Sequence, residues 1–224
     1  QNYMSKKNAF TSMPHNRLTI VPVSEWIKDE MQRSFFRGYD FRVIHNGINT
    51  QVFKLFDAGL IKNKYSLNGK HILLGVASIW SKEKGLDDFI RLSGMLNENE
   101  IIVLVGVDAK TQRYLPRNII GINRTENVHE LAELYSAADV FVNPTWQDNY
   151  PTVNMEAIAC GTPVVTYHTG GSIEAVTEDT GRIVTQGNVK ELLDVIRNIM
   201  VKGKSYYRAR CRAYALTHFR KEDR

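Results

Sequence analysis

The sequence predicts an α/β fold, a doubly wound parallel sheet with helices on both faces. Short and nearly continuous apolar runs recur through the middle of the chain, and segments with helically spaced apolar residues alternate with them. The length of 224 residues, with 43% hydrophobic and 24% charged residues, suits a domain with a full core. This composition excludes a disordered chain, a collagen-like chain and a disulfide-stapled miniprotein.

The strands and helices of the sheet domain are expected to alternate in chain order. We predict strands at residues 72–77, 101–105, 118–122, 139–143, 163–167 and 182–184. We predict helices at residues 85–96, 128–138, 151–160, 189–200 and 206–217, with a short helix starting near residue 172. The helix at 151–160 has the clearest limits, because Pro151 suits a first helical turn and Gly161 and Pro163 are stop signals.

The N-terminal part of the chain fits this alternation less well. We predict a strand at residues 18–23, a helix at 24–35 and a strand at 41–44. Residues 1–17 show no clear period and are predicted to belong to a different unit. The chain starts with Gln1 instead of Met, so we expect a processed product or a fragment.

Charge is concentrated at the C-terminal end of the chain. The whole sequence has a net charge of +5, while residues 202–224 hold eight Lys or Arg residues against two acidic ones, a net of +6. We interpret this segment as a solvated basic helix. The alternatives are contact with an anionic membrane surface or with nucleic acid, but no interleaving of aromatic and basic residues indicates a nucleic-acid reader.

The sequence predicts no metal site and no membrane span. Cys160 and Cys211 form no CxxC pair, no His/Cys cluster has zinc spacing, and two reduced thiols in a reducing compartment are expected. No apolar stretch approaches the ~20 residues that cross a bilayer, and the first residues lack the apolar core of a signal peptide. We therefore expect a cytoplasmic protein.

Two strand-to-helix junctions hold the most informative polar residues, because open parallel sheets bind ligands beyond the carboxyl ends of their strands. Residues 75–85 end in Lys84-Gly85 at a helix start, where a lysine is repelled by the helix dipole unless an anion lies between them. This favours a phosphate contact. The alternative is a surface lysine, since the spacing is neither that of a P-loop nor GxGxxG.

The junction at residues 143–157 places Asp148 in a loop and Glu156 inside the following helix. Two carboxylates on either side of a helix start suit several sugar hydroxyls, and the N–H groups of residues 150–153 are candidate free donors. The alternative is that Asp148 caps the helix and Glu156 is solvated or ion-paired.

A third junction, residues 166–174, contains Gly170 and Gly171, which allow close approach to a ligand or serve a tight turn. His45 and His168 lie at junctions, but no histidine has a Ser or Cys placed for a catalytic triad.

Together these segments resemble the C-terminal domain of retaining glycosyltransferases of family 4, which have the GT-B fold. Four stretches carry the resemblance, and their order and separations match over residues 19–200. They are VSEWIK at 23–28 with IHNGIN at 44–49, KGL at 84–86, Asp148 to Glu156 followed by AIACGTPVV, and GGSIE at 170–174. The resemblance implies that the doubly wound sheet is Rossmann-like and forms the C-terminal half of a GT-B fold.

The resemblance also implies a role for each site residue. Lys84 would hold the donor diphosphate. Asp148 and Glu156 would be the catalytic pair, with Asp148 contacting the donor sugar and Glu156 the ribose. The expected donor-binding set is completed by Ser78, Asn123 and Arg124 toward the nucleotide, and by Asn149, Tyr150, Pro151 and Thr152, whose loop would offer backbone donors.

Three departures from the family pattern concern this same site. Asp148 replaces the usual glutamate, Ile79 stands near the place of a common arginine, with Lys82 as the candidate substitute, and Asn149-Tyr150-Pro151 replaces G-F-G.

The implied function is donor binding in a retaining hexosyltransferase. The donor would be a UDP- or GDP-linked sugar, the acceptor a glycan or a lipid-linked glycan, and the role bacterial surface polysaccharide synthesis such as capsule formation. No cofactor or metal is implied, since no DxD motif is present. The enzyme is expected in the cytoplasm, with a peripheral contact to the inner face of the membrane.

The resemblance implies three segments in this chain. Residues 1–17 would end a missing N-terminal domain, residues 18–201 would bind the donor, and residues 202–224 would pack back on the missing domain. The chain alone would bind donor and transfer little. The alternatives are a GT-B-fold UDP-sugar epimerase and a non-catalytic nucleotide-binding Rossmann module.

Overall fold

A computed structural model describes residues 2–223, so Gln1 and Arg224, at the outer ends of the two predicted terminal segments, lie outside the described residues. Its centre is a six-stranded sheet in the order β5-β4-β3-β6-β7-β8, and every pairing is parallel. The strands are β3 (His71–Val76), β4 (Glu100–Val105), β5 (Ile119–Ile122), β6 (Val140–Asn143), β7 (Val164–Tyr167) and β8 (Gly181–Val184). The predicted doubly wound sheet is confirmed.

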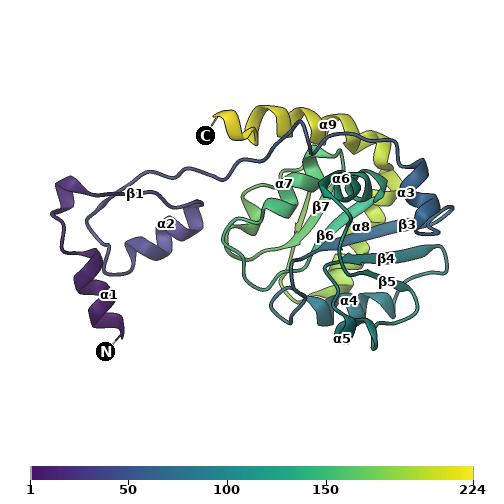
Figure 1. Cartoon of the computed structure of the whole chain (residues 1–224), viewed down its shortest axis with the longest axis horizontal. Helices are drawn as coiled ribbons and strands as arrows, with labels where there is room; N and C mark the ends of the chain where they lie inside the picture. Colours follow the sequence, from purple (N-terminus) through teal and green to yellow (C-terminus); the bar gives the residue numbers. More distant parts are fainter. Residues whose placement is uncertain (1, 224) are drawn as a thin grey trace.

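Helices cover both faces of this sheet (Figure 1). On one face α4 (Leu86–Ser93) and α8 (Val189–Lys202) pack together against β4, β6 and β7. On the other face α6 (Val128–Ala137) and α7 (Thr152–Ala159) pack against β3, β6 and β7. The strands are buried on both sides, which explains why Leu73, Leu74, Ile102 and Val103 form uninterrupted apolar runs.

Three helices complete the domain. α3 (Gly59–Lys64) packs on α6, α5 (Ala109–Gln112) follows β4, and α9 (Lys204–His218) packs on α7. The sequence did not predict α3 or α5, because helices this short show no full apolar period. The short helix expected near residue 172 is a 3-10 turn, η2 (Gly170–Ile173), and a final 3-10 turn, η3, spans Lys221–Asp223.

The N-terminal residues form a small separate unit. β1 (Thr19–Ile20) and β2 (Asp40–Phe41) pair in their own two-stranded parallel sheet, with α2 (Glu25–Gln32) between them in the chain. Before them lie α1 (Asn2–Phe10) and η1 (His15–Arg17). No residue of α1 is buried, so the helix has no apolar face for a sequence pattern to reveal. The three predicted segment boundaries stay predictions.

An extended connection joins this unit to the sheet domain and runs beside the C-terminal helix (Figure 1). Within it, Ile48 N–H donates to the Phe219 carbonyl over 2.7 Å, and Lys221 N–H donates to the Ile48 carbonyl over 3.1 Å. Arg212 of α9 donates to the carbonyl groups of Thr50 and Phe53 in the same connection. The extended connection is thus bonded to the C-terminal segment of the chain.

Within residues 2–223, no helix combines the length and apolarity needed to cross a membrane. The two cysteines are buried and are not joined in a disulfide.

Candidate functional site

The main cleft lies where the strand order reverses. β3 is flanked by β4 and β6, and the helices after β3 and β6 lie on opposite faces of the sheet, which is the arrangement that leaves a crevice at the carboxyl ends. A hollow of about 690 Å³ opens over the ends of β3, β4 and β5, and one of about 370 Å³ opens over the ends of β3 and β6. Both are lined by Val76, Ala77, Ser78 and Val153, so they adjoin as one cleft.

Nine of the ten residues of the predicted site line this cleft, and the tenth, Asn149, lies beside it. The larger hollow is lined by Ser78, Asn123, Arg124 and Glu156, and the smaller by Ser78, Lys84, Asp148, Tyr150, Pro151 and Thr152. Asn149 lines a neighbouring hollow together with Lys84 and Asp148. Their roles toward a ligand stay predictions.

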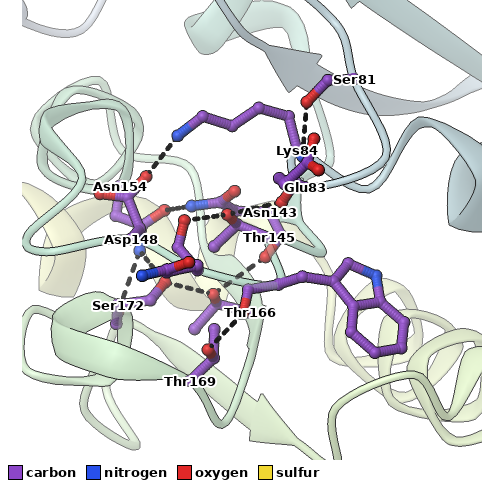
Figure 2. A network of polar contacts seen from close by, with 12 residues as sticks. Ser81, Glu83, Lys84, Asn143, Thr145, Asp148, Asn154, Thr166, Thr169 and Ser172 are labelled. Carbon is purple, nitrogen blue, oxygen red and sulfur yellow. Dashed lines mark hydrogen bonds and ion pairs between the residues drawn. The ribbon is translucent and has the colours of Figure 1, made fainter.

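Lys84 meets Asp148 across the smaller hollow (Figure 2). The Lys84 ammonium nitrogen donates to Asp148 Oδ2 over 2.7 Å, with 40% of the lysine side chain and 18% of the aspartate side chain exposed. Gly85 brings the two loops this close: its φ is +78°, and a Cβ there would lie 2.3 Å from the Pro144 carbonyl oxygen. The alternative that Asp148 caps α7 is wrong, because the cap position is Pro151 and no side chain bonds there.

The start of α7 therefore offers backbone donors without a side-chain cap. The first N–H groups of a helix have no intrahelical acceptor and carry the positive end of its dipole. Thr152 and Val153, at this start, line the cleft. An anionic group in the smaller hollow would meet these donors and the Lys84 ammonium together.

Glu156 forms the opposite, less polar end of the site. Tyr135 donates its hydroxyl to Glu156 Oε2 over 3.0 Å, and burial raises the pKa of both groups, so the tyrosine remains a donor. The hydrogen-bond partner of Glu156 is thus a neutral hydroxyl, and no cation of residues 2–223 forms an ion pair with it. Its side chain remains partly exposed at the larger hollow. Its position on the larger hollow leaves it able to accept hydrogen bonds from hydroxyl groups.

A buried polar network fixes the loop after β6 (Figure 2). Asn143 Nδ2 donates to Asn154 Oδ1 over 2.8 Å, and Asn154 Nδ2 donates to the Ser172 carbonyl over 3.1 Å. Thr166 donates to the Asn143 carbonyl and lies 2.6 Å from the Ser172 hydroxyl. Because these groups are buried and hydrogen-bonded, they hold the end of β6, the start of α7 and η2 in one geometry.

The paired glycines approach the protein backbone closely. Gly171 N–H donates to the Asp148 carbonyl over 3.0 Å, and a Cβ on Gly171 would lie 1.8 Å from the Asn149 carbonyl oxygen. Gly170 has a φ of +48°, and a Cβ there would lie 2.2 Å from the Asp148 carbonyl oxygen. Of the two predicted uses, the structure has the tight turn, with the close approach made by the loop that carries Asp148.

Sequence reasoning missed part of the cleft wall. Trp80, which donates its indole N–H to the Val105 carbonyl over 2.9 Å, lines the larger hollow with Asp108, Thr125 and Leu131. Trp80 lies in the junction after β3, and this position in the sequence could have identified it as a residue of the cleft. A largely apolar hollow with a carboxylate, beside a smaller hollow with a lysine and a helix start, suits a ligand with a flat ring, hydroxyl groups and an anionic group.

Known proteins resemble this chain both in sequence and in fold. The sequence model of the family described as glycosyl transferases group 1 matches residues 70–201. A D-inositol 3-phosphate glycosyltransferase of Streptosporangium roseum is 27% identical over 166 residues, which cover 65% of this chain and 38% of that protein. The capsular polysaccharide biosynthesis glycosyltransferase CapM of Staphylococcus aureus is 25% identical, covering 69% of this chain and 43% of CapM. The chain thus spans less than half of the length of these relatives.

Solved structures share the fold over nearly the whole chain. Sucrose-phosphate synthase from Thermosynechococcus elongatus superposes with a TM-score of 0.82 at 22% identity, covering 99% of this chain and 58% of that one. HepE of Anabaena, solved in complex with UDP-glucose, superposes with a TM-score of 0.80 at 18% identity, covering 99% of this chain and 64% of that one.

Proposed function

This chain belongs to the glycosyl transferases group 1 family, and we propose that it is the donor-binding half of a retaining hexosyltransferase. The cleft at the ends of β3 and β6 carries this proposal, because Lys84 and the start of α7 lie at one hollow and Glu156 lies at the other. A nucleoside-diphosphate sugar carries its base, ribose and diphosphate in an order that matches the order of these residues along the cleft. We assign the diphosphate to Lys84 and α7, the ribose hydroxyls to Glu156, and the base to the wall formed by Trp80 and Arg124.

The proposed chemistry is electrostatic. When the bond between the sugar and the diphosphate breaks, negative charge accumulates on the leaving phosphate, and the Lys84 ammonium and the N–H groups of α7 stabilise it in place. Asp148, beside Lys84, contacts the sugar hydroxyls. Retention of configuration follows if the acceptor attacks on the face that the phosphate leaves.

The acceptor side of the reaction is proposed to lie in another domain. The solved relatives are longer than this chain, which covers 58% and 64% of the two compared above. We propose that the missing domain binds a glycan or a lipid-linked glycan, and that the chain alone binds donor without appreciable transfer. The name of CapM supports a role in surface polysaccharide synthesis, and we place the enzyme in the cytoplasm at the inner face of the membrane.

The donor is proposed to be a UDP-sugar. HepE was solved with UDP-glucose, with UDP, and with UDP and glucose, and its fold matches this chain. GDP remains the competing nucleotide, so both belong in the test.

Calorimetric titration of the chain with UDP, GDP, ADP and UDP-glucose tests the proposal. We expect one diphosphate to bind, and Lys84→Ala and Glu156→Ala each to weaken it about 10- to 100-fold, the value of one or two hydrogen bonds to charged groups. Lys190→Ala, on the exposed side of α8, is the matched control and should change nothing. Absence of binding to all four ligands, or unchanged affinity in Lys84→Ala, would contradict the proposal.

A further inference from the structure

η2 lies between the loop that holds Asp148 and the start of α2. On one side, Gly171 N–H bonds the Asp148 carbonyl over 3.0 Å. On the other side, a Cβ on Gly171 would lie 3.0 Å from the Cβ of Ser24, which is fully buried. The turn is therefore packed against the candidate site and the N-terminal unit at once, at a residue that tolerates no side chain.

Glu174, directly after η2, caps α2 from a distant part of the chain. Its Oε2 accepts from the Glu25 N–H over 3.0 Å, and its Oε1 accepts from the Trp26 N–H over 2.9 Å. The Ser24 hydroxyl accepts from the Ile27 N–H over 3.1 Å, so the first three donors of α2 are satisfied. A carboxylate at a helix start gains both the charged hydrogen bonds and the favourable dipole.

A second contact joins the same two parts of the molecule. The His45 ring stacks on Tyr150, with ring centroids 4.7 Å apart and an angle of 18° between the planes. Tyr150 is buried and lines the smaller hollow of the cleft. His45 also contacts the N-terminal unit, since its Nδ1 lies 3.0 Å from the Val23 carbonyl. The same nitrogen lies 3.9 Å from Oε2 of Glu174, which belongs to the sheet domain.

We propose that Glu174 is a positioning residue that couples the donor loop to α2. The proposal rests on the proposed function, because the loop in question is the one assigned to the donor. Glu174 is not among the residues that line the two hollows, so it acts through η2 and through the stack of His45 on Tyr150. Occupation of the smaller hollow shifts Tyr150, and the N-terminal unit follows because Glu174 and His45 hold it.

Fluorine NMR of the chain labelled with 5-fluorotryptophan tests this coupling. The three tryptophans report on different places: Trp80 on the cleft, Trp26 on the start of α2, and Trp146 on the loop before Asp148. Each resonance is assigned by one Trp→Phe substitution. On titration with UDP and with GDP, we expect the Trp80 and Trp26 resonances of the unchanged chain to shift with the same midpoint.

Glu174→Ala should separate the two responses. The Trp80 shift should persist with a midpoint about fivefold higher, the loss expected when a helix cap no longer orders its partner, while the Trp26 shift should disappear. Glu174→Gln retains one amide oxygen as an acceptor and should restore part of the Trp26 response.

A milder variant keeps the test valid if Glu174→Ala fails to fold. Glu25 is the first helical residue after Ser24, whose backbone is extended, so Glu25→Pro removes one of the two N–H donors in a position that suits proline. It should reduce the Trp26 response without affecting the helix. Glu25→Pro also removes the ion pair of Glu25 with Lys28, which is 2.8 Å long. Lys28→Ala removes that pair and leaves both N–H donors in place, so it is the control.

The outcomes separate this proposal from the proposed function. If Trp80 responds and Trp26 does not in the unchanged chain, or if Glu174→Ala keeps the full Trp26 response, the coupling is refuted and donor binding stands. If neither resonance responds to either nucleotide, the proposed donor binding is refuted, and so is the coupling that depends on it.

Discussion

Lys84 and Asp148 place opposite charges where we propose that a diphosphate and a sugar meet. Their contact of 2.7 Å involves a lysine that is 40% exposed, and ion pairs this accessible to water contribute little to stability. The two side chains have opposite effects on a ligand. The lysine attracts phosphate, while the aspartate repels phosphate and accepts hydrogen bonds from hydroxyl groups.

Asp148→Asn should therefore change the affinities for UDP and for UDP-glucose by different amounts. Without the carboxylate, the diphosphate no longer meets a like charge, and UDP should bind about three- to tenfold more tightly, by roughly 1 kcal/mol. The gain of UDP-glucose over UDP should fall. Titration calorimetry of both ligands measures this, with Asp148→Glu as the variant that retains the charge. Weaker UDP binding in Asp148→Asn would show that the aspartate mainly orients Lys84.

The individual site residues were predictable where their signal is local. Lys84, Asp148 and the residues after it follow buried strands directly, and parallel strands end at one edge of the sheet. The contacts between them were not predictable, because Tyr135 reaches Glu156 from another helix and Glu174 reaches Trp26 over 148 positions of sequence. Such partners depend on how elements pack, which periodicity does not reveal.

At the scale of elements, α8 is tied to the beginning of β4 by a partly buried ion pair. Arg197 donates to both carboxylate oxygens of Glu100, over 3.0 and 2.9 Å, and only 4% of the Glu100 side chain is exposed. The Arg197 guanidinium lowers the pKa of Glu100 below its ordinary value of 4.5. The ionised carboxylate is thus favoured by folding.

Arg197→Met should lower the free energy of unfolding at neutral pH by about 1 kcal/mol, since Arg197 is itself 36% exposed and the pair is partly screened. A lowered pKa in the folded state gives stability that is complete above 4.5 and is lost as the pH falls through the folded value. Urea unfolding at neutral pH and in acid should show the difference shrinking in acid. Lys190→Met on the same helix is the control, and a difference that does not depend on pH would indicate lost packing alone.

The elements themselves were predictable in proportion to their burial. β3 and β4 have continuous apolar runs because both faces are covered, and the predicted strands match them. α1 has no buried residue and was not predicted. The strands predicted at 18–23 and 41–44 overlap β1 and β2, but each observed strand has only two residues. Their structure depends on contacts within the small N-terminal unit.

At the scale of the whole molecule, Arg212 of α9 joins three separate parts of the chain. It donates to the carbonyl groups of Thr50 and Phe53 in the extended connection and of Ala159 at the end of α7. Thr50 and Phe53 lie in no helix or strand, and Ala159 is the last residue of α7. The guanidinium provides the bonds that a strand neighbour would give.

Arg212→Met should loosen the connection more than it unfolds the sheet domain. We expect a loss of about 2 kcal/mol in unfolding free energy and faster cleavage between residues 42 and 58, since carbonyl groups are left without their donor. Limited proteolysis with mapping of the cut sites measures this. Arg210→Met, whose partner Asp179 is 3.6 Å away and exposed, is the control. Equal cleavage of both variants would contradict the assignment.

The strand order has a consequence for how the molecule assembles. β3, β4 and β5 are consecutive in the chain and lie side by side, and so are β6, β7 and β8, so each half of the sheet can form from neighbouring sequence. Within the described sheet, the halves are joined by the pairing of β3 with β6, at Leu73 with Val140 and Leu74 with Phe141. During synthesis the first half of the sheet is complete before β6 leaves the ribosome. The seam between the halves, the pairing of β3 with β6, therefore forms late. Because the cleft lies across that seam, the ligand that we propose would stabilise the junction that forms last.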